Sequence, residues 1–332
     1  MTDLSLTEDF DLQPHHTFGL PSRARWGGFL HRPEHIAEAL GFAQARGLPF
    51  FLLGGGSNVV PLPFVDGVVG VLRLSGRSLA RGADGVVRLT AAAGESWPEL
   101  VAWTVGQGIG GLENLSGIPG TVGAAPVQNI GAYGTEIAEL VDSVRVLDLT
   151  DLSQQVIAGA DCAFRYRQSR FKDEPGRYAI LSVTLALPTD WAPNLGYRGL
   201  DTLPQTATPA EVAEAVLAIR GSKLPDWRVL GNAGSFFHNP VVAADHPAAQ
   251  IEGAPRYPAP DGVKLSAGWL LEQAGMKGHR LGGAGFHAGH ALVMVNHGTA
   301  TCEDVAALTA EAQAAVQAKF GVALVREPLT LG

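Results

Sequence analysis

Two glycine-rich segments of this chain carry the residues best suited to binding an anion. The first is 54–58 (Gly-Gly-Gly-Ser-Asn), which follows an apolar run, and the second is 111–134, with six glycines and a single charged side chain, Glu113. Glycine lets successive backbone N–H groups point at one ligand without side chains in the way, and such a surface suits a diphosphate. We name these segments the first and second glycine loops. Together they predict a large dinucleotide held from both sides.

Two common nucleotide-binding motifs are excluded. The first glycine loop lacks the third glycine of G-x-G-x-x-G, and no helical pattern follows it, so it is not a dinucleotide fingerprint of the Rossmann type. No G-K-[ST] occurs anywhere in the chain, which excludes a P-loop. Each loop taken alone could equally be a set of tight turns, so the choice between turns and a ligand-binding loop depends on the rest of the chain.

Helices and strands alternate irregularly around these loops. Capping and stop residues predict helices from Pro33 to Gly47, from Ser96 to Gly108, from Thr208 past Ile219, and from about Cys302 to Phe320. Strand-like runs are 68–74, 86–92, 141–147, 178–187, 291–295 and 322–331. Because many strands have no helix after them, the pattern predicts an α+β fold rather than a doubly wound parallel sheet.

Composition narrows the functional class. The chain has 332 residues, 46% hydrophobic and 17% charged, and a net charge of −8, which argues against nucleic-acid binding. Its two cysteines, Cys162 and Cys302, lie far apart, so neither a disulfide framework nor a zinc cluster is expected. The first residues lack the pattern of a signal peptide, and no apolar run is long enough to span a bilayer. We therefore expect a cytoplasmic protein that does not enter a membrane.

Six ordered motifs resemble the UDP-N-acetylenolpyruvoylglucosamine reductase (UDP-N-acetylmuramate dehydrogenase) family. The resemblance runs from His16 to Glu327. The motifs are LGGGSN (53–58), GLENLSGIPGTVGAAPVQNIGAYG (111–134), FRYRQSRFK (164–172), KLPD (223–226), GNAGSFFHNP (231–240) and KLSAGWLLEQAGMKG (264–278). It implies non-covalent FAD, NADPH as co-substrate, and reduction of the enolpyruvyl ether of a UDP-sugar to UDP-N-acetylmuramate for peptidoglycan synthesis. Tyr197 suggests the subtype with a tyrosine substrate loop.

The same resemblance implies the domain plan. We expect the two-subdomain FAD-binding fold of the PCMH flavin-oxidase type, followed by a C-terminal α+β substrate-binding domain. The first subdomain would span 1–75, the second 76–222 together with a C-terminal strand at 323–332, and the substrate domain 223–322. We expect a monomer.

The reaction would need a cation and a proton donor. A hydride delivered to C3 leaves an enolate spread into the carboxylate, and C2 must then gain a proton. By resemblance, Arg167 binds the carboxylate and Ser235 donates the proton. Glu327 is the C-terminal acid that orients or protonates. Which of Ser235 and Glu327 is the proton source stays open.

Further residues are assigned to ligands by the resemblance. The positions expected to hold FAD are Gly54, Gly55, Gly56, Ser57, Asn58, Ile118, Pro119, Gly120, Thr121, Gly123, Gly131, Ala132, Tyr133 and Arg220. Those expected to hold the UDP-sugar are Tyr197, Lys223, Asn239, Lys277 and His290.

The chain departs from its relatives at three histidines. His290 stands where relatives usually carry Gln, which leaves its role open, His238 replaces a common Lys, and His16 stands where Asn often precedes Thr-Phe-Gly. The spacing of His279, His287, His290 and His297 matches no metal-ligand motif, so we expect no metal.

Two other functions compete with the reductase. One is a flavin oxidase on the same fold that passes electrons to oxygen. Such enzymes often tether FAD through His or Cys, and neither glycine loop contains one. The other is a flavin or nucleotide-sugar binding module without activity, which the joint presence of Arg167, Ser235 and Glu327 disfavours.

Overall fold

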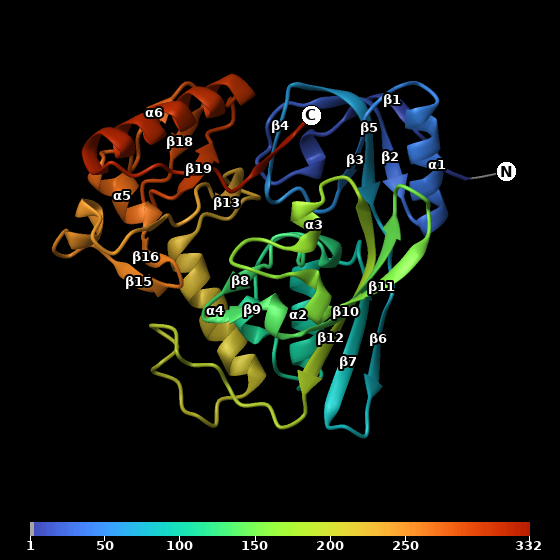
Figure 1. Ribbon diagram of the computed structural model, residues 1–332, viewed down its shortest axis with the longest axis horizontal. Helices are drawn as coiled ribbons and strands as arrows, with labels where there is room; N and C mark the ends of the chain where they lie inside the picture. The colour runs from blue at the N-terminus through green and yellow to red at the C-terminus, as the bar shows by residue number, and fades with distance from the viewer. Residues whose placement is uncertain (1–2) are drawn as a thin grey trace. The chain divides into compact units, whose positions relative to one another are not determined.

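The computed structural model describes residues 3–332 and divides the chain into two compact units. The first unit comprises the chain up to Phe10 together with Ala24–Gly55 and Asp66–Ser222. The second comprises Asp11–Arg23, Gly56–Val65 and Lys223–Gly332. Figure 1 shows the mixed helices and strands of both units, as expected of an α+β chain. The domain boundaries inferred by resemblance stay a prediction.

One sheet has the order β1-β2-β5-β3, and its strands are Thr7–Asp11, Arg23–Leu30, Phe64–Leu72 and Phe50–Leu53. Strand β3 runs parallel to β5, with Phe50 opposite Val68. Helix α1 (Pro33–Gln44) lies between β2 and β3 in the chain. It begins with Pro33 at its first turn and buries Ile36, Ala39 and Ala43. The first glycine loop follows β3 directly.

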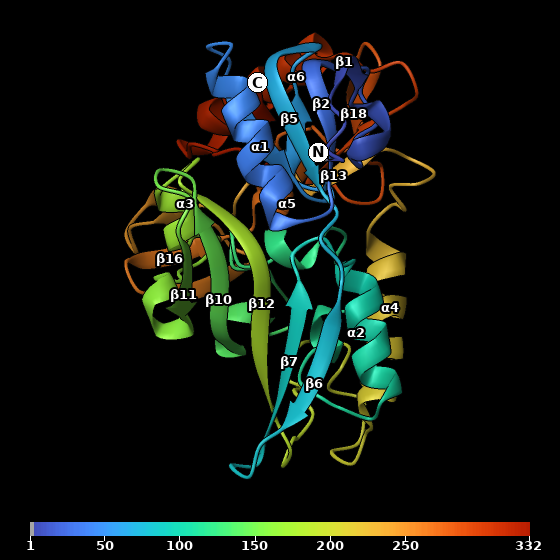
Figure 2. The ribbon, with the colours of Figure 1, turned by 90° about the vertical axis from the view of Figure 1, so that its right-hand side faces the viewer.

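The first unit also contains an antiparallel five-stranded sheet with the order β11-β10-β12-β7-β6. Figure 2 shows these long strands side by side. Helix α2 (Trp97–Gly106) buries Trp97, Leu100 and Val101 in the core that the sheet contributes to. Ser96 caps this helix, its Oγ accepting a hydrogen bond from the Glu99 N–H at 3.4 Å. The strands are β6 (Arg77–Arg81), β7 (Val86–Ala92), β10 (Val141–Asp148), β11 (Gln154–Ala158) and β12 (Tyr178–Pro188).

The second unit is built on a sheet with the order β13-β19-β18-β17. Helix α6 (Cys302–Phe320) packs against this sheet and against α5 (Ala267–Gln273). Thr301 and Asp304 form a capping box at the start of α6, and Gly321, with φ +68°, ends it. The core contains the stacked pair Phe237 and Phe286, with ring centres 6.5 Å apart. The strands are β13 (Asn232–Ser235), β19 (Val293–Asn296), β18 (Ala284–Phe286) and β17 (Arg280–Leu281).

The four predicted helices are confirmed, and most strands lie where the sequence indicates. The predicted strand over 322–331 is wrong for most of its length. Only β20 (Leu329–Leu331) forms there, parallel to β4 (Val59–Pro61), while Arg326 makes a separate bridge to Phe237. Pro328 lies between the two pairings and has no N–H to donate, so one continuous ladder cannot form.

The remaining elements are short. Helix α4 (Pro209–Lys223) is the exception in length, and the turn of helix α3 spans Arg170–Asp173. The 3-10 turns are η1 (Gln13–His15), η2 (Glu113–Leu115), η3 (Val122–Ala124), η4 (Ile137–Glu139), η5 (Gly159–Cys162) and η6 (Pro247–Gln250). The last strands are β8 (Gly131–Ala132), β9 (Thr135–Glu136), β14 (Val241–Val242), β15 (Arg256–Ala259) and β16 (Gly262–Leu265). Across residues 3–332, no helix combines the length and apolar character needed to cross a membrane.

Candidate active site

Within the first unit, the two glycine loops touch through their backbones. A Cβ on Gly55 would lie 2.7 Å from the Gly120 Cα, and one on Gly54 would lie 2.5 Å from the Thr121 Oγ1. Both distances are too short for real side chains, so these positions require glycine. The sequence suggested that both loops bind one ligand, and the structure brings Gly54–Gly55 and Gly120–Thr121 together.

The paired loops fit a phosphate-bearing ligand. Thr121 Oγ1 is buried and has no hydrogen-bond partner within the described residues. A buried hydroxyl without a partner is costly, and a ligand can supply that partner. Gly117 and Gly120 have φ of +72° and +124°, a backbone conformation that residues with a side chain rarely adopt. The loops therefore offer closely packed backbone and one unsatisfied hydroxyl.

Arg220 supplies a cation beside the second glycine loop. A Cβ on Gly117 would lie 3.0 Å from the Arg220 Cδ, so the side chain of this α4 residue lies over that glycine. Burial lowers the pKa of Arg220, and the Tyr133 hydroxyl, which interacts with it, opposes that shift. This guanidinium is half-buried, and its fixed positive charge is suited to bind an anion.

Tyr133 lies at the tip of the β8–β9 hairpin. The hairpin pairs Ala132 with Thr135, so Tyr133 and Gly134 form a two-residue turn, and both have positive φ (+50° and +84°). Such a turn matches the twist of the strands but normally excludes a tyrosine. The Tyr133 ring meets that of Tyr197 edge-on at 4.9 Å. Tyr133, Tyr197 and Arg220 thus form one group in the first unit.

Arg167 also lies at a strained turn. The backbones of Arg165 and Gln168 exchange two hydrogen bonds of 3.0 Å, and Arg167 between them has φ +55°. Its guanidinium donates to the carbonyls of Gly131 at 3.0 Å and Asn129 at 3.4 Å. Strained non-glycine residues persist only where surrounding contacts hold them, and they concentrate at functional sites. The carboxylate-binding candidate is therefore held against the second glycine loop.

The arginines that flank Arg167 make contacts of their own. Arg165 makes two hydrogen bonds to Asp173, at 2.8 and 2.9 Å, and Arg170 pairs with Glu174 at 2.9 Å. The Lys172 ammonium donates to the Arg167 carbonyl at 3.1 Å. These contacts tie the turn to α3.

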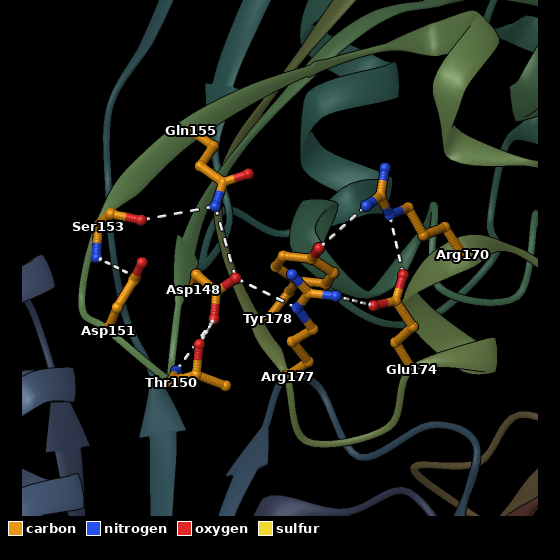
Figure 3. A network of polar contacts seen from close by, with 9 residues as sticks. All are labelled: Asp148, Thr150, Asp151, Ser153, Gln155, Arg170, Glu174, Arg177 and Tyr178. Carbon is orange, nitrogen blue, oxygen red and sulfur yellow. Dashed lines mark hydrogen bonds and ion pairs between the residues drawn. The ribbon is translucent and has the colours of Figure 1, made fainter.

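A polar network continues from α3 to the end of β10 and the start of β12 (Figure 3). Arg177 bridges Glu174 and Asp148, and Arg170 donates to the Tyr178 hydroxyl at 3.2 Å. The Thr150 hydroxyl, followed by other donors including Arg177, lowers the pKa of Asp148. The Arg167 turn is thus anchored to β10 and β12 through charged side chains.

Ser235 lies at the end of a bulged strand in the second unit. Asn232 pairs with Val295 and Ser235 with Val293, so β13 has one residue more than β19 over this stretch. Gly234 takes up the bulge with φ +72°. The next two residues, Phe236 and Phe237, are fully buried. The bulge sets the position of Ser235, and the phenylalanines fix the strand in the core.

The C-terminal segment pairs with the residues after Ser235. The Glu327 N–H donates to the Phe236 carbonyl at 3.0 Å, and the His238 N–H donates to the Val325 carbonyl at 2.9 Å. Glu327 is nearly buried, and one of its carboxylate oxygens lies 3.5 Å from the His238 Nδ1. The Asn58 side-chain amide donates to the Glu327 carbonyl at 3.4 Å. Glu327 therefore joins the segment that carries Ser235 to the end of the first glycine loop.

Gly56 packs against the chain at His16. A Cβ on Gly56 would lie 2.5 Å from the His16 Cα, and the Thr17 N–H donates to the Gly56 carbonyl at 3.1 Å. The buried His16 ring binds the Leu20 carbonyl through Nε2 at 3.1 Å, while its Nδ1 has no partner within residues 3–332. Burial lowers the pKa of His16 to about 4, so the ring is neutral. This packing was not predicted.

Candidate substrate residues gather around α5 in the second unit. The Asn239 Oδ1 accepts a hydrogen bond from the Ala267 N–H at 2.9 Å, at the start of α5. A Cβ on Gly268 would lie 3.7 Å from the His290 Cε1. Burial lowers the pKa of His290, and the nearby charges of His287, Lys223 and Lys277 lower it further. Asn239, Lys223, Lys277 and His290 are thus all in one unit.

Residues that hold the Tyr197 loop were missed by the sequence analysis. Glu113 is buried, and its Oε1 accepts a hydrogen bond from the Trp191 indole at 2.9 Å. Asn114 donates to the carbonyls of Tyr133 and Asn194, at 2.8 and 2.9 Å. Glu113 is the one charged residue of the second glycine loop, and this could have indicated a structural role for it.

The remaining candidates lie in the glycine loops or on their flanks. Arg167 belongs to the first unit, whereas Ser235 and Glu327 belong to the second. The first glycine loop is divided, with Gly56, Ser57 and Asn58 in the second unit. Ile118, Pro119, Gly123, Gly131 and Ala132 lie in the first unit. In the part of the chain from Asp3 onward, no three His, Cys, Asp or Glu residues are grouped as a metal site requires.

Comparison with known proteins identifies the family. Residues 29–151 match an FAD binding domain, and residues 225–331 match the UDP-N-acetylenolpyruvoylglucosamine reductase C-terminal domain. The reductase of Burkholderia cenocepacia is 47% identical over 99% of this chain and 97% of its own length, and that of Burkholderia multivorans is 46% identical over the same shares. The crystal structure of the reductase from Thermus caldophilus has the same fold, with a TM-score of 0.67 at 24% identity over the whole of both chains. The chain belongs to the UDP-N-acetylenolpyruvoylglucosamine reductase family.

Proposed function

We propose that this protein reduces UDP-N-acetylglucosamine enolpyruvate to UDP-N-acetylmuramate, with FAD as cofactor and NADPH as reductant. Relatives that carry the reductase name align over nearly their full length, and the FAD binding domain covers both glycine loops. The observation that carries the proposal is the pairing of residues 236–238 with 325–327, which fixes Glu327 beside the strand that ends at Ser235.

The glycine loops would hold FAD. Gly54 and Gly55 let the two loops pack closely, so that their backbone N–H groups could be presented together to its diphosphate. Thr121 offers a hydroxyl that has no hydrogen-bond partner within residues 3–332, and Arg220 adds positive charge. When bound, FAD would supply two-electron chemistry, namely the transfer of a hydride equivalent from NADPH to C3 of the enolpyruvyl group.

Arg167 would bind the carboxylate of the enolpyruvyl group. Its planar guanidinium can donate two parallel hydrogen bonds to a carboxylate and stays charged as the enolate forms. The Gly131 and Asn129 carbonyls orient that guanidinium, and the Lys172 contact fixes its backbone. The strained turn thereby presents a fixed cation where negative charge develops.

Ser235 would give the proton to C2, with Glu327 as its partner or as the alternative source. A serine hydroxyl is a weak acid, so a nearby group must stabilise the oxyanion or replace the proton. The nearly buried carboxylate of Glu327 would be one such group, and the ammonium of Lys223 in the same unit would be another. The buried pair Phe236 and Phe237 excludes water behind the serine.

The UDP half would be bound by Lys223, Asn239, Lys277 and His290, with Tyr197 closing over it. Residues 223–322 would form the substrate domain, and the remainder of the chain would form the two FAD subdomains. We further propose that the protein works as a monomer in the cytoplasm, where nucleotide sugars and NADPH are available.

The anaerobic visible spectrum of the purified protein tests the proposal. Flavin absorbance should be bleached by NADPH and restored by UDP-N-acetylglucosamine enolpyruvate. Restoration by air, with no response to the sugar, would favour a flavin oxidase. Protein that neither contains nor takes up FAD would contradict both enzymes and leave a binding module.

A further inference from the structure

The turn between β18 and β19 carries two imidazoles in the same arrangement. The Gly289 N–H donates to the His287 Nδ1 at 3.3 Å, and the Leu292 N–H donates to the His290 Nδ1 at 3.3 Å. Each ring thus caps the backbone two residues further on. Because each Nδ1 accepts, the ring proton of the neutral form lies on Nε2. The turn therefore presents two Nε2–H donors.

Gly289 makes room for the first of these rings. A Cβ on Gly289 would lie 3.0 Å from the His287 Cε1 and 3.3 Å from its Nδ1. The imidazole lies over the turn in the space that a side chain at 289 would fill. His287 is half-buried, so its ring is held in place and yet remains accessible.

The surroundings of this turn are rich in donors and positive charge. Lys223 and Lys277 act on His290, and Arg280 and His287 act on His297. The pKa of His290 and that of His297 are lowered, first by burial and then by these charges. The Lys277 ammonium pairs with the Glu272 carboxylate at 2.8 Å. The neighbourhood thus offers ammonium and imidazole donors to a ligand with several negatively charged oxygens.

We propose that His287 is a further substrate-binding residue, whose Nε2–H donates with that of His290 to the oxygens of the substrate's nucleoside diphosphate. The inference rests on the proposed function, because it assigns a residue to the UDP half of that substrate. The two lysines provide charge, whereas the imidazoles provide direction, since each ring is fixed by its own backbone hydrogen bond.

Two substitutions at His287 separate its two nitrogens. His287→Asn places an amide oxygen near the former Nδ1, which can still accept from the Gly289 N–H, but it removes the outer donor. His287→Gln is longer and places an amide N–H near the former Nε2. His246 provides a matched control, because its Nδ1 caps the Ala248 N–H at 3.1 Å in the same way on η6.

The experiment is calorimetric titration of the FAD-loaded protein with UDP, combined with steady-state kinetics. His287→Asn should weaken UDP binding about tenfold and raise KM for the UDP-sugar, with KM for NADPH unchanged. His287→Gln should remain within about threefold of wild type, and His246→Asn should bind UDP as wild type does.

Equal UDP affinity in His287→Asn and wild type would overturn the inference. So would an equal loss in both His287 variants accompanied by a lowered Tm, since that would indicate a structural role. In either case wild-type protein still binds UDP and still shows flavin reoxidation by the sugar substrate. Wild-type protein that fails in both respects overturns the proposed function together with this inference.

Discussion

Arg167 and Ser235 are held in place by different forces. Arg167 lies at a turn with positive φ, tied to α3 by charged side chains that are largely exposed. Ser235 ends a bulged strand whose next two residues, Phe236 and Phe237, are fully buried. Exposed ion pairs are weak and screened by salt, whereas buried aromatic rings contribute strongly to stability. The position of the Arg167 guanidinium should therefore depend on ionic strength. The position of the Ser235 hydroxyl should depend on the packing of the core in its unit.

The largest expected effect is that of removing the proton donor itself. Ser235→Ala should slow reoxidation of the reduced flavin by the sugar substrate about 1000-fold, within the range of general acid catalysis. Reduction by NADPH should stay close to the wild-type rate, because that step needs no proton at C2. Stopped-flow absorbance under anaerobic conditions measures both half-reactions. Equal loss in both would show that Ser235 is not the donor.

The core behind Ser235 should be the next most sensitive. Phe237→Ala removes a fully buried ring that contacts Phe236 and Phe286, and it should lower the free energy of unfolding by about 3–5 kcal/mol. Chemical denaturation measures this loss. Val325→Ala is the matched control in the segment that pairs with 236–238, since Val325 is 62% exposed and should change stability by less than about 0.5 kcal/mol. A small loss in Phe237→Ala would contradict the core-based account of Ser235.

The sequence could predict the elements that have local signals, but not the contacts between residues far apart in the chain. The four capped helices and the strands β7, β10 and β12 follow from local signals, namely caps, glycine stops and apolar runs. The contact of Gly54–Gly55 with Gly120–Thr121 joins residues far apart in the chain. The sequence indicated it only indirectly, through the prediction that both loops bind one ligand. Roles for Arg167, Ser235 and Glu327 came from resemblance, since each residue alone is ordinary.

Other features left no local signal. The positive φ of Tyr133 and Arg167 is set by hairpin and turn contacts that single residues do not encode. The C-terminal segment reads as a continuous apolar strand, yet its two halves pair with different partners on either side of Pro328. Sequence patterns therefore give the elements, whereas the geometry of the site depends on long-range packing.

The buried ring of His16 should make the stability of the second unit depend on pH. Its pKa is 6.5 in the unfolded chain and about 4 in the folded one. Between these two pH values the unfolded state therefore binds more protons than the folded state. The free energy of unfolding is highest above pH 6.5, and it falls by about 3 kcal/mol as the pH drops toward 4. His16→Asn should remove this loss, as urea unfolding across that pH window would reveal. His246→Asn is the control, and an acid sensitivity unchanged in His16→Asn would exclude His16 as its source.

The smallest effect is expected on the Arg167 side. Asp173→Asn removes the carboxylate that binds Arg165 but keeps an amide at the same place, so Tm should change little. The turn that carries Arg167 should become less fixed, and KM for the sugar substrate should rise by less than about threefold at low salt. At about 1 M salt the difference should vanish, because the wild-type ion pair is then screened as well. Lys319→Gln is a control for lost surface charge, since Lys319 belongs to the second unit and contacts the Gln273 carbonyl. A KM difference that persists at high salt would mean that Asp173 holds the turn by packing, and Arg167 and Ser235 would then not differ in the forces that hold them.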